Sequence, residues 1–232
     1  MAPVSMKREQ LSTVADLLPP SASIRGINRA RLISVIRRRP GLTRAALSRI
    51  SGLSKGTVSN LVDELLSEGF LYEDSGDGRR QRNLTLWLNR KAGVAVGIEL
   101  AAEECRGVLT DTQMSTLRHV DRAMKSTHVE DSIDLLVSIT EELLLGIEEP
   151  CLGVAIAVPA ATDQQGQSVV IAESLGWTDV PLATRLAERL RCRVTLVNRP
   201  RAGVLGEYWY GAGRGTKNLI YLSVSSGVGA GI

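Results

Sequence analysis

A chain of 232 residues, with 44% apolar residues and a net charge of +3, fits a globular protein of more than one compact unit. Its longest apolar stretch, residues 153–161, is far shorter than the roughly 20 residues of a membrane-spanning helix. The sequence shows no secretion signal, and its three cysteines and two histidines have no metal-ligand spacing. It therefore predicts a cytoplasmic protein with no membrane partner, no metal site and no cofactor.

Charge is distributed unevenly along the chain. Residues 1–91 hold 16 Lys and Arg against 8 Asp and Glu, whereas residues 92–232 hold 12 against 17. A basic first part followed by an acidic second part indicates that only the first part meets a polyanion.

The first 91 residues are predicted to form a flexible arm and a small helical domain. Residues 1–25 are assigned to the arm, because Pro19 and Pro20 among serines break a helix. A helix is then predicted from Ile27, Ala30, Ile33 and Ile36 at helical spacing, with Leu32 and Val35 widening this apolar stripe, and Pro40-Gly41 stops it. Two more helices follow within a domain spanning 26–91. Capping residues mark both ends of these two helices. Thr43 starts and Gly52 ends the second helix, and Ser54 starts and Gly69 ends the third.

A β-hairpin is predicted after the third helix. Residues 71–73 are followed by a loop and by residues 84–88, which have strong strand propensity. Residues 75–78 in the loop read Ser-Gly-Asp-Gly, which suits a hairpin turn. Together these elements predict a winged helix-turn-helix, mainly helical with a β-hairpin wing.

The pattern changes in the second predicted domain, residues 92–232. Three short strands over 94–100, 105–110 and 113–120 precede an amphipathic helix over 129–147 and a buried strand over 152–158. Helices and strands then alternate, which predicts an α/β domain with a largely parallel core. The later predicted elements are a helix over 182–190, a strand over 194–197, a helix over 202–209 and a strand over 219–224.

The third helix carries the features of a DNA-recognition helix. Its exposed start contains small residues and hydrogen-bond donors with one cation and no acid, and such a start can face base edges in the major groove. The predicted contacts there are Ser54, Lys55, Gly56, Thr57, Ser59 and Asn60, with Thr43 and Arg44 from the preceding helix. Arg79, Arg80 and Arg82 at the hairpin tip are predicted to reach phosphates or a narrow minor groove.

Residues 27–60, followed by Gly78-Arg79-Arg80 and Leu86-Trp87-Leu88-Asn89, resemble the winged helix-turn-helix of the ROK family of repressors and sugar kinases. The resemblance implies a repressor of the xylose or N-acetylglucosamine type and continues to the last residue. For residues 92–232 it implies a partial actin-like, ribonuclease-H-like ROK domain. The family has further chain beyond the position of Ile232, so the second lobe and its zinc motif are expected to be missing.

The resemblance also implies that kinase chemistry has been lost. The family's phosphate loop reads Asp-x-Gly-Gly-Thr, whereas residues 99–103 read Glu-Leu-Ala-Ala-Glu, whose methyl groups and carboxylate disfavour phosphate. The family's catalytic Asn-Asp pair matches Asn198 and Arg199, and an arginine cannot act as a general base. Asn198 and Trp177, the latter in a segment that resembles a sugar-flanking loop, are the predicted effector-binding residues.

Three functions remain open at this point. The first is a DNA-binding regulator, expected to be a homodimer that represses transcription and responds to a sugar. The second is a sugar kinase with an appended DNA-binding head, which Arg199 disfavours. The third is a DNA-binding module whose second domain is a non-sensing remnant.

Overall fold

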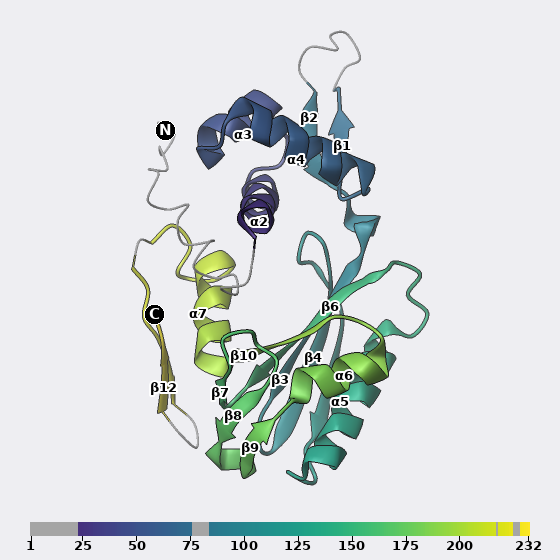
Figure 1. Ribbon diagram of the computed structural model, residues 1–232, viewed down its shortest axis with the longest axis vertical. Helices are drawn as coiled ribbons and strands as arrows, with labels where there is room; N and C mark the ends of the chain where they lie inside the picture. The colour runs from purple at the N-terminus through teal and green to yellow at the C-terminus, as the bar shows by residue number, and fades with distance from the viewer. Residues whose placement is uncertain (1–22, 76–83, 217, 225–227) are drawn as a thin grey trace. The chain divides into compact units, whose positions relative to one another are not determined.

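The computed structural model describes residues 23–75, 84–216, 218–224 and 228–232. This part of the chain divides into two compact units (Figure 1). The first contains the residues up to Ala92 together with Thr112–Met114, and the second contains Gly93–Asp111 and the residues from Ser115 onward. The division falls one residue after the end of the predicted DNA-binding domain at Lys91.

The first unit is a winged helix-turn-helix with the predicted element order. Its elements are α2 (Ile24–Arg38), α3 (Arg44–Ser51), α4 (Lys55–Ser67), β1 (Leu71–Asp74) and β2 (Thr85–Leu88). The predicted caps are present, because Thr43 and Ser54 accept hydrogen bonds from backbone amides at the starts of α3 and α4. Gly52 ends α3 in the left-handed conformation, with φ of 71°. Helix α2 begins before Ile27, within the predicted arm, because Ser23 caps it by accepting from the Gly26 amide at 3.1 Å.

The core of the first unit joins all three helices to the wing. The side chains of Leu32, Ile36, Leu47, Leu65 and Leu86 are fully buried in one cluster. The prediction centred the buried stripe of α2 on Ile27, Ala30, Ile33 and Ile36, with Leu32 and Val35 at its edge. In the structure the buried positions are Leu32, Val35 and Ile36, while Ile33 is partly buried against the same cluster. Helix α2 contacts α3 and β2.

The second unit is built on a five-stranded sheet with the order β10-β6-β3-β4-β5. Its strands are β3 (Val94–Leu100), β4 (Glu104–Asp111), β5 (Thr116–Ala123), β6 (Cys151–Val158) and β10 (Val194–Asn198). Strands β10, β6 and β3 run parallel, whereas β3, β4 and β5 form an antiparallel meander. The sheet is therefore mixed rather than largely parallel, because short turns between consecutive strands permit only antiparallel pairing.

Three helices accompany this sheet, namely α5 (Val129–Leu144), α6 (Leu182–Leu190) and α7 (Arg199–Trp209). Helices α5 and α6 pack against each other, and α5 contacts β3, β4 and β5 while α6 contacts β10 (Figure 1). Gly107 on β4 permits the close approach of α5, because a Cβ atom there would lie 2.6 Å from Ile139 Cγ2. Helix α5 ends before the predicted residue 147, at an exposed Leu145 followed by Gly146 with φ of 69°.

Three short strands were not predicted, and β7 (Ala161–Thr162), β8 (Val169–Ala172) and β9 (Trp177–Val180) form a three-stranded antiparallel sheet. The predicted strand over 219–224 is present as β11 (Tyr221–Val224), which pairs with β12 (Val228–Gly231). Two 3-10 helices, η3 (Arg90–Ala92) and η4 (Glu173–Leu175), complete the fold. Within the described ranges, none of the helices has the length and apolarity needed to cross a membrane.

Candidate nucleic-acid interface and candidate effector site

The N-terminal half of α4 presents an open polar surface. Lys55, Gly56 and Asn60 are exposed, and the side chains of Lys55 and Asn60 make no hydrogen bond within the described ranges. Ser54 and Thr57 stabilise the start of α4 through hydrogen bonds to each other. The Ser54 hydroxyl accepts from the Thr57 amide at 3.1 Å and lies 2.8 Å from the Thr57 hydroxyl. The predicted contact residues of α4 therefore divide into residues available to a ligand and residues that fix the helix start.

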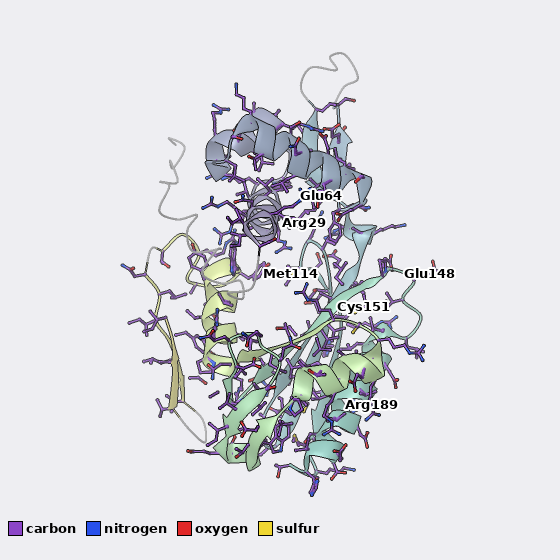
Figure 2. The ribbon with its side chains drawn as sticks, in the orientation of Figure 1. Arg29, Glu64, Met114, Glu148, Cys151 and Arg189 are labelled. Carbon is purple, nitrogen blue, oxygen red and sulfur yellow. The ribbon has the colours of Figure 1, made fainter. Side chains whose placement is uncertain are left out.

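Glu64 and Glu68, at the C-terminal end of α4, are neutralised by arginines of α2. Glu64 is bound by Arg25 at 2.5 Å and by Arg29 at 3.1 Å, and Arg29 also donates to Glu68. Figure 2 shows Arg29 and Glu64 next to each other between the two helices. The hydrogen bond from Arg29 lowers the pKa of Glu68, and the same contact raises the pKa of Arg29. These carboxylates therefore carry little net charge toward an approaching polyanion.

Arg44 has the corresponding role on the other flank of α4. Its guanidinium binds Asp63 of α4 at 2.6 Å and Glu73 of β1 at 3.0 Å, and lies 3.3 Å from the Ser59 hydroxyl. Burial opposes the charge of this guanidinium, but the hydrogen bonds to the two carboxylates outweigh it and raise the pKa of Arg44. Arg44 thus holds α3, α4 and the wing together, which is a different arrangement from a freely exposed phosphate ligand.

The base of the wing is fixed by backbone contacts. Leu71 pairs with Leu88 in the hairpin, and the Leu86 amide donates to the Leu42 carbonyl at 2.9 Å, which ties the wing to the start of the helix-turn-helix. The predicted contacts Arg79, Arg80 and Arg82 lie outside the described residues. Their contact with DNA stays a prediction.

The predicted effector residues lie in the second unit and have partners there. Asn198 ends β10 and caps α7, since its carbonyl oxygen accepts from the Arg201 amide at 3.4 Å and its NH₂ donates to the Ala160 carbonyl at 2.9 Å. The Trp177 indole is only 3% exposed, and its NH donates to the Thr127 carbonyl at 2.6 Å. Trp177 is therefore a core residue, and Asn198 is the half-buried residue of the two.

Arg199 forms an ion pair at the carboxyl edge of the parallel strands. Its guanidinium lies 2.8 Å from the Glu99 carboxylate, so it joins the start of α7 to the end of β3. The neighbouring stretch that resembles a phosphate loop is a tight turn between β3 and β4, in which the Ala101 amide donates to the Glu104 carbonyl at 2.9 Å. This amide is thus already occupied. Within the described ranges, no group of three or more His, Cys, Asp and Glu side chains is placed to hold a metal ion.

Sequence reasoning missed the ion pairs that surround α4. Arg25 and Glu64 are 39 residues apart, and Arg44 and Asp63 are 19 apart, so no local spacing reveals them. The same is true of Arg199 and Glu99. One signal was available in the composition, because α2 and α3 contain several arginines and no acid, whereas the acids of α4 lie in its second half.

These features define a class of two-unit proteins in which a winged helix-turn-helix precedes an actin-like α/β unit. The chain belongs to the ROK family, whose sequence pattern matches residues 95–232, and residues 26–81 match the MarR family. Both the predicted family and the predicted fold class are confirmed. A crystal structure of a ROK family transcriptional regulator, a homolog of the E. coli MLC protein, has the same fold with a TM-score of 0.76 at 19% identity. It matches 90% of this chain and 54% of its own length.

Among named relatives, the chain is similar to xylose repressors and to glucokinases. It is 34% identical to a putative xylose repressor of Caldicellulosiruptor sp. (strain Rt8B.4), over 91% of this chain and 54% of the relative. It is 30% identical to the xylose repressor of Bacillus subtilis (strain 168), over 90% of this chain and 56% of that repressor. The glucokinase of Thermotoga maritima is 31% identical over 59% of this chain and 43% of the glucokinase. The chain thus spans about half the length of the repressors it matches.

Proposed function

We propose that the chain is a DNA-binding transcriptional regulator, acting as a cytoplasmic homodimer that represses transcription and responds to a sugar. One observation carries the proposal. The N-terminal half of α4 exposes hydrogen-bond donors, while arginines of α2 and α3 hold every described acid of that helix. Such a helix can enter the major groove without repelling the phosphates.

The proposed contacts differ in their roles. Lys55 and Asn60 read base edges, for which Lys–guanine and Asn–adenine pairing are the expected forms. Gly56 and Ser59 allow close approach of the DNA, and Thr43, Ser54 and Thr57 fix the helix starts. Arg44 positions α4 and the wing. Arg79, Arg80 and Arg82 bind phosphates from the wing.

The sugar response is proposed from the named relatives. The relatives that match 90% or more of this chain include xylose repressors, so a xylose-like sugar is the first candidate effector. Asn198 is its proposed ligand, because its amide lies at the carboxyl edge of the parallel strands, where open α/β sheets bind ligands. Binding of the sugar would favour one of two arrangements of the dimer and so change its fit to the operator.

We also propose that the chain does not transfer phosphoryl groups. Arg199 stands where the resemblance places the catalytic acid, and it is bound to Glu99. A guanidinium cannot accept the sugar hydroxyl proton. Incubation with ATP and a sugar panel, followed by detection of ADP, tests this directly, and sugar-dependent ADP would overturn it.

A DNA-binding module without a sugar sensor is the second candidate. It is favoured by the engagement of both predicted effector residues, since Trp177 is buried and both ends of the Asn198 amide are hydrogen-bonded. Calorimetric titration with xylose and related sugars separates the two candidates. Heat that disappears in Asn198→Ala supports the sensor, and an absence of heat with every sugar supports the module.

The wing provides the test of DNA binding. Binding of purified protein to its own upstream DNA is measured across a salt series for wild type and for the double variant Arg79→Ala/Arg80→Ala. The logarithmic salt slope should fall by about one for each phosphate that the variant no longer neutralises. The double variant Arg185→Ala/Arg189→Ala on α6 removes the same charge from the second unit and serves as the matched control. Equal slopes for all three proteins would exclude the wing from the DNA.

A further inference from the structure

A hollow of about 290 Å³ lies between the start of α2 and the middle of α4, within the first unit. Its walls come from two helices, and the residues that line it are Ile24, Arg25, Asn28, Thr57, Asn60 and Leu61. The hollow therefore includes one of the proposed base-reading residues. Arg25 and Asn28 are absent from the contacts that the sequence predicts.

The hollow has both apolar and polar walls. Ile24 and Leu61 supply the apolar part, while the amides of Asn28 and Asn60 and the Arg25 guanidinium supply donors. The side chain of Arg25 is 70% exposed and its partner Glu64 only 26%, so the cation lies outside the carboxylate. Within the described ranges, the side chain of Asn28 makes no hydrogen bond. Its amide therefore remains available to a ligand.

A deoxyribose-phosphate unit matches these walls, because it too has an apolar part and a polar part. Its sugar has apolar faces, and its phosphate accepts hydrogen bonds from amides and guanidinium groups. A recognition helix in the major groove is bordered by the two phosphate backbones. Since Asn60 belongs both to the exposed face of α4 and to the hollow, a backbone bordering that groove would meet the N-terminal turn of α2.

We propose that this hollow binds the DNA backbone, with the Asn28 amide and the Arg25 guanidinium as phosphate ligands. The inference rests on the proposed function and extends the DNA-binding surface from α4 and the wing to a third element, α2. These contacts would fix the register of α4 in the groove without reading a base.

The test compares Asn28→Ala and Arg25→Gln with wild type on two duplexes, the upstream DNA of the gene and an unrelated sequence, across a salt series. Arg39→Gln is the matched control, because it removes the same charge from the exposed opposite end of α2. Thermal unfolding shows whether each variant is folded. Asn28→Ala should unfold at the wild-type temperature, since it removes no described hydrogen bond.

Asn28→Ala is expected to weaken binding to both duplexes roughly tenfold, the loss of one hydrogen bond to a charged group. Arg25→Gln should also lower the salt slope by about one, and Arg39→Gln should leave it unchanged. Wild-type affinity and slope in both α2 variants would overturn the proposal while leaving the proposed function intact. Loss of discrimination in Asn28→Ala would also overturn it, because the residue would then read a base. If wild type binds neither duplex, the proposed function itself fails.

Discussion

Arginine–carboxylate pairs occur in both units of the molecule, with opposite consequences. In the first unit, Arg25, Arg29 and Arg44 bind the acids of α4, and the start of that helix remains open to a ligand. In the second unit, Arg199 binds Glu99 at the carboxyl edge of the parallel strands, where the family resemblance predicts a catalytic acid. Under the proposed function, one kind of ion pair can make a surface receptive to a polyanion or keep a general base out of a phosphate site. The pair's position relative to the ligand decides which.

The largest expected effect tests whether the two units are energetically separate. Leu47 is fully buried in the core of the first unit, and Ile156 is fully buried in that of the second. Each of Leu47→Ala and Ile156→Ala should lower the free energy of unfolding of its own unit by about 2–5 kcal/mol. Hydrogen exchange read by mass spectrometry assigns the loss of protection to residues of one unit. Equal loss in both units for either variant would show a single cooperative unit.

The next effect concerns the open start of α4. Lys55→Ala and Asn60→Ala should each reduce discrimination between the operator and a mismatched site by about 1–3 kcal/mol if the contact is bidentate. The measurement is competition binding with single-base operator variants. Glu188→Ala, on α6 of the second unit, is a control that should leave discrimination unchanged. A uniform loss of affinity across all sites would assign either residue to the backbone instead.

Removal of Arg44 tests the neutralising role of the arginines. Arg44→Ala would leave Asp63 and Glu73 unpaired beside the DNA, so affinity for every duplex should fall by about 1 kcal/mol. The double variant Arg44→Ala/Asp63→Asn should recover part of this loss, because one of the two repelling charges is removed. If the double variant binds as weakly as Arg44→Ala, the guanidinium itself contacts the DNA.

The ion pair of the second unit should have a smaller effect. Arg199→Ala is expected to change the free energy of unfolding by less than about 1 kcal/mol, because both partners are partly exposed. It should leave DNA affinity unchanged. Arg199→Asp should not create kinase activity, because residues 101–103 still read Ala-Ala-Glu and the Ala101 amide is engaged. ADP formation by Arg199→Asp would show that this single residue had blocked the reaction.

The smallest effect is a loss of stability at alkaline pH. Burial raises the pKa of Cys105 and of Cys192 to about 11, from a value near 9 in the unfolded chain. Because the folded pKa is the higher one, this contribution is complete below about pH 9 and is lost as the pH rises toward about 11. Urea unfolding at pH 8 and at pH 10.5 should therefore differ less in Cys105→Ala than in wild type. An equal difference in both proteins would assign the alkaline loss to other groups.

The sequence allowed the element order of the first unit and the bounds of α3 and α4 to be predicted, because caps such as Thr43, Ser54 and Gly52 act within a few residues. It also allowed recognition of the family. Three features escaped it for physical reasons. The strands β7, β8 and β9 are too short to show an alternation, the mixed sheet depends on tertiary pairing, and the ion pairs of α4 join residues far apart in sequence.

The candidate site was only partly predictable for the same reasons. Residue types identified Lys55 and Asn60 as available donors, since exposure follows from helical periodicity. Periodicity could not show that Trp177 would be buried with its NH bonded to Thr127, or that Asn198 would cap a helix. Both outcomes depend on neighbours brought together by the fold.

The central claim is that the first unit binds a specific DNA sequence and the second responds to a sugar. The most direct test is binding of the purified chain to its own upstream DNA across a salt series, with and without xylose and related sugars. We predict specific, salt-sensitive binding that a sugar weakens and that Lys55→Ala impairs. Equal affinity for upstream and unrelated DNA would contradict the claim, and specific binding indifferent to every sugar would contradict its second half.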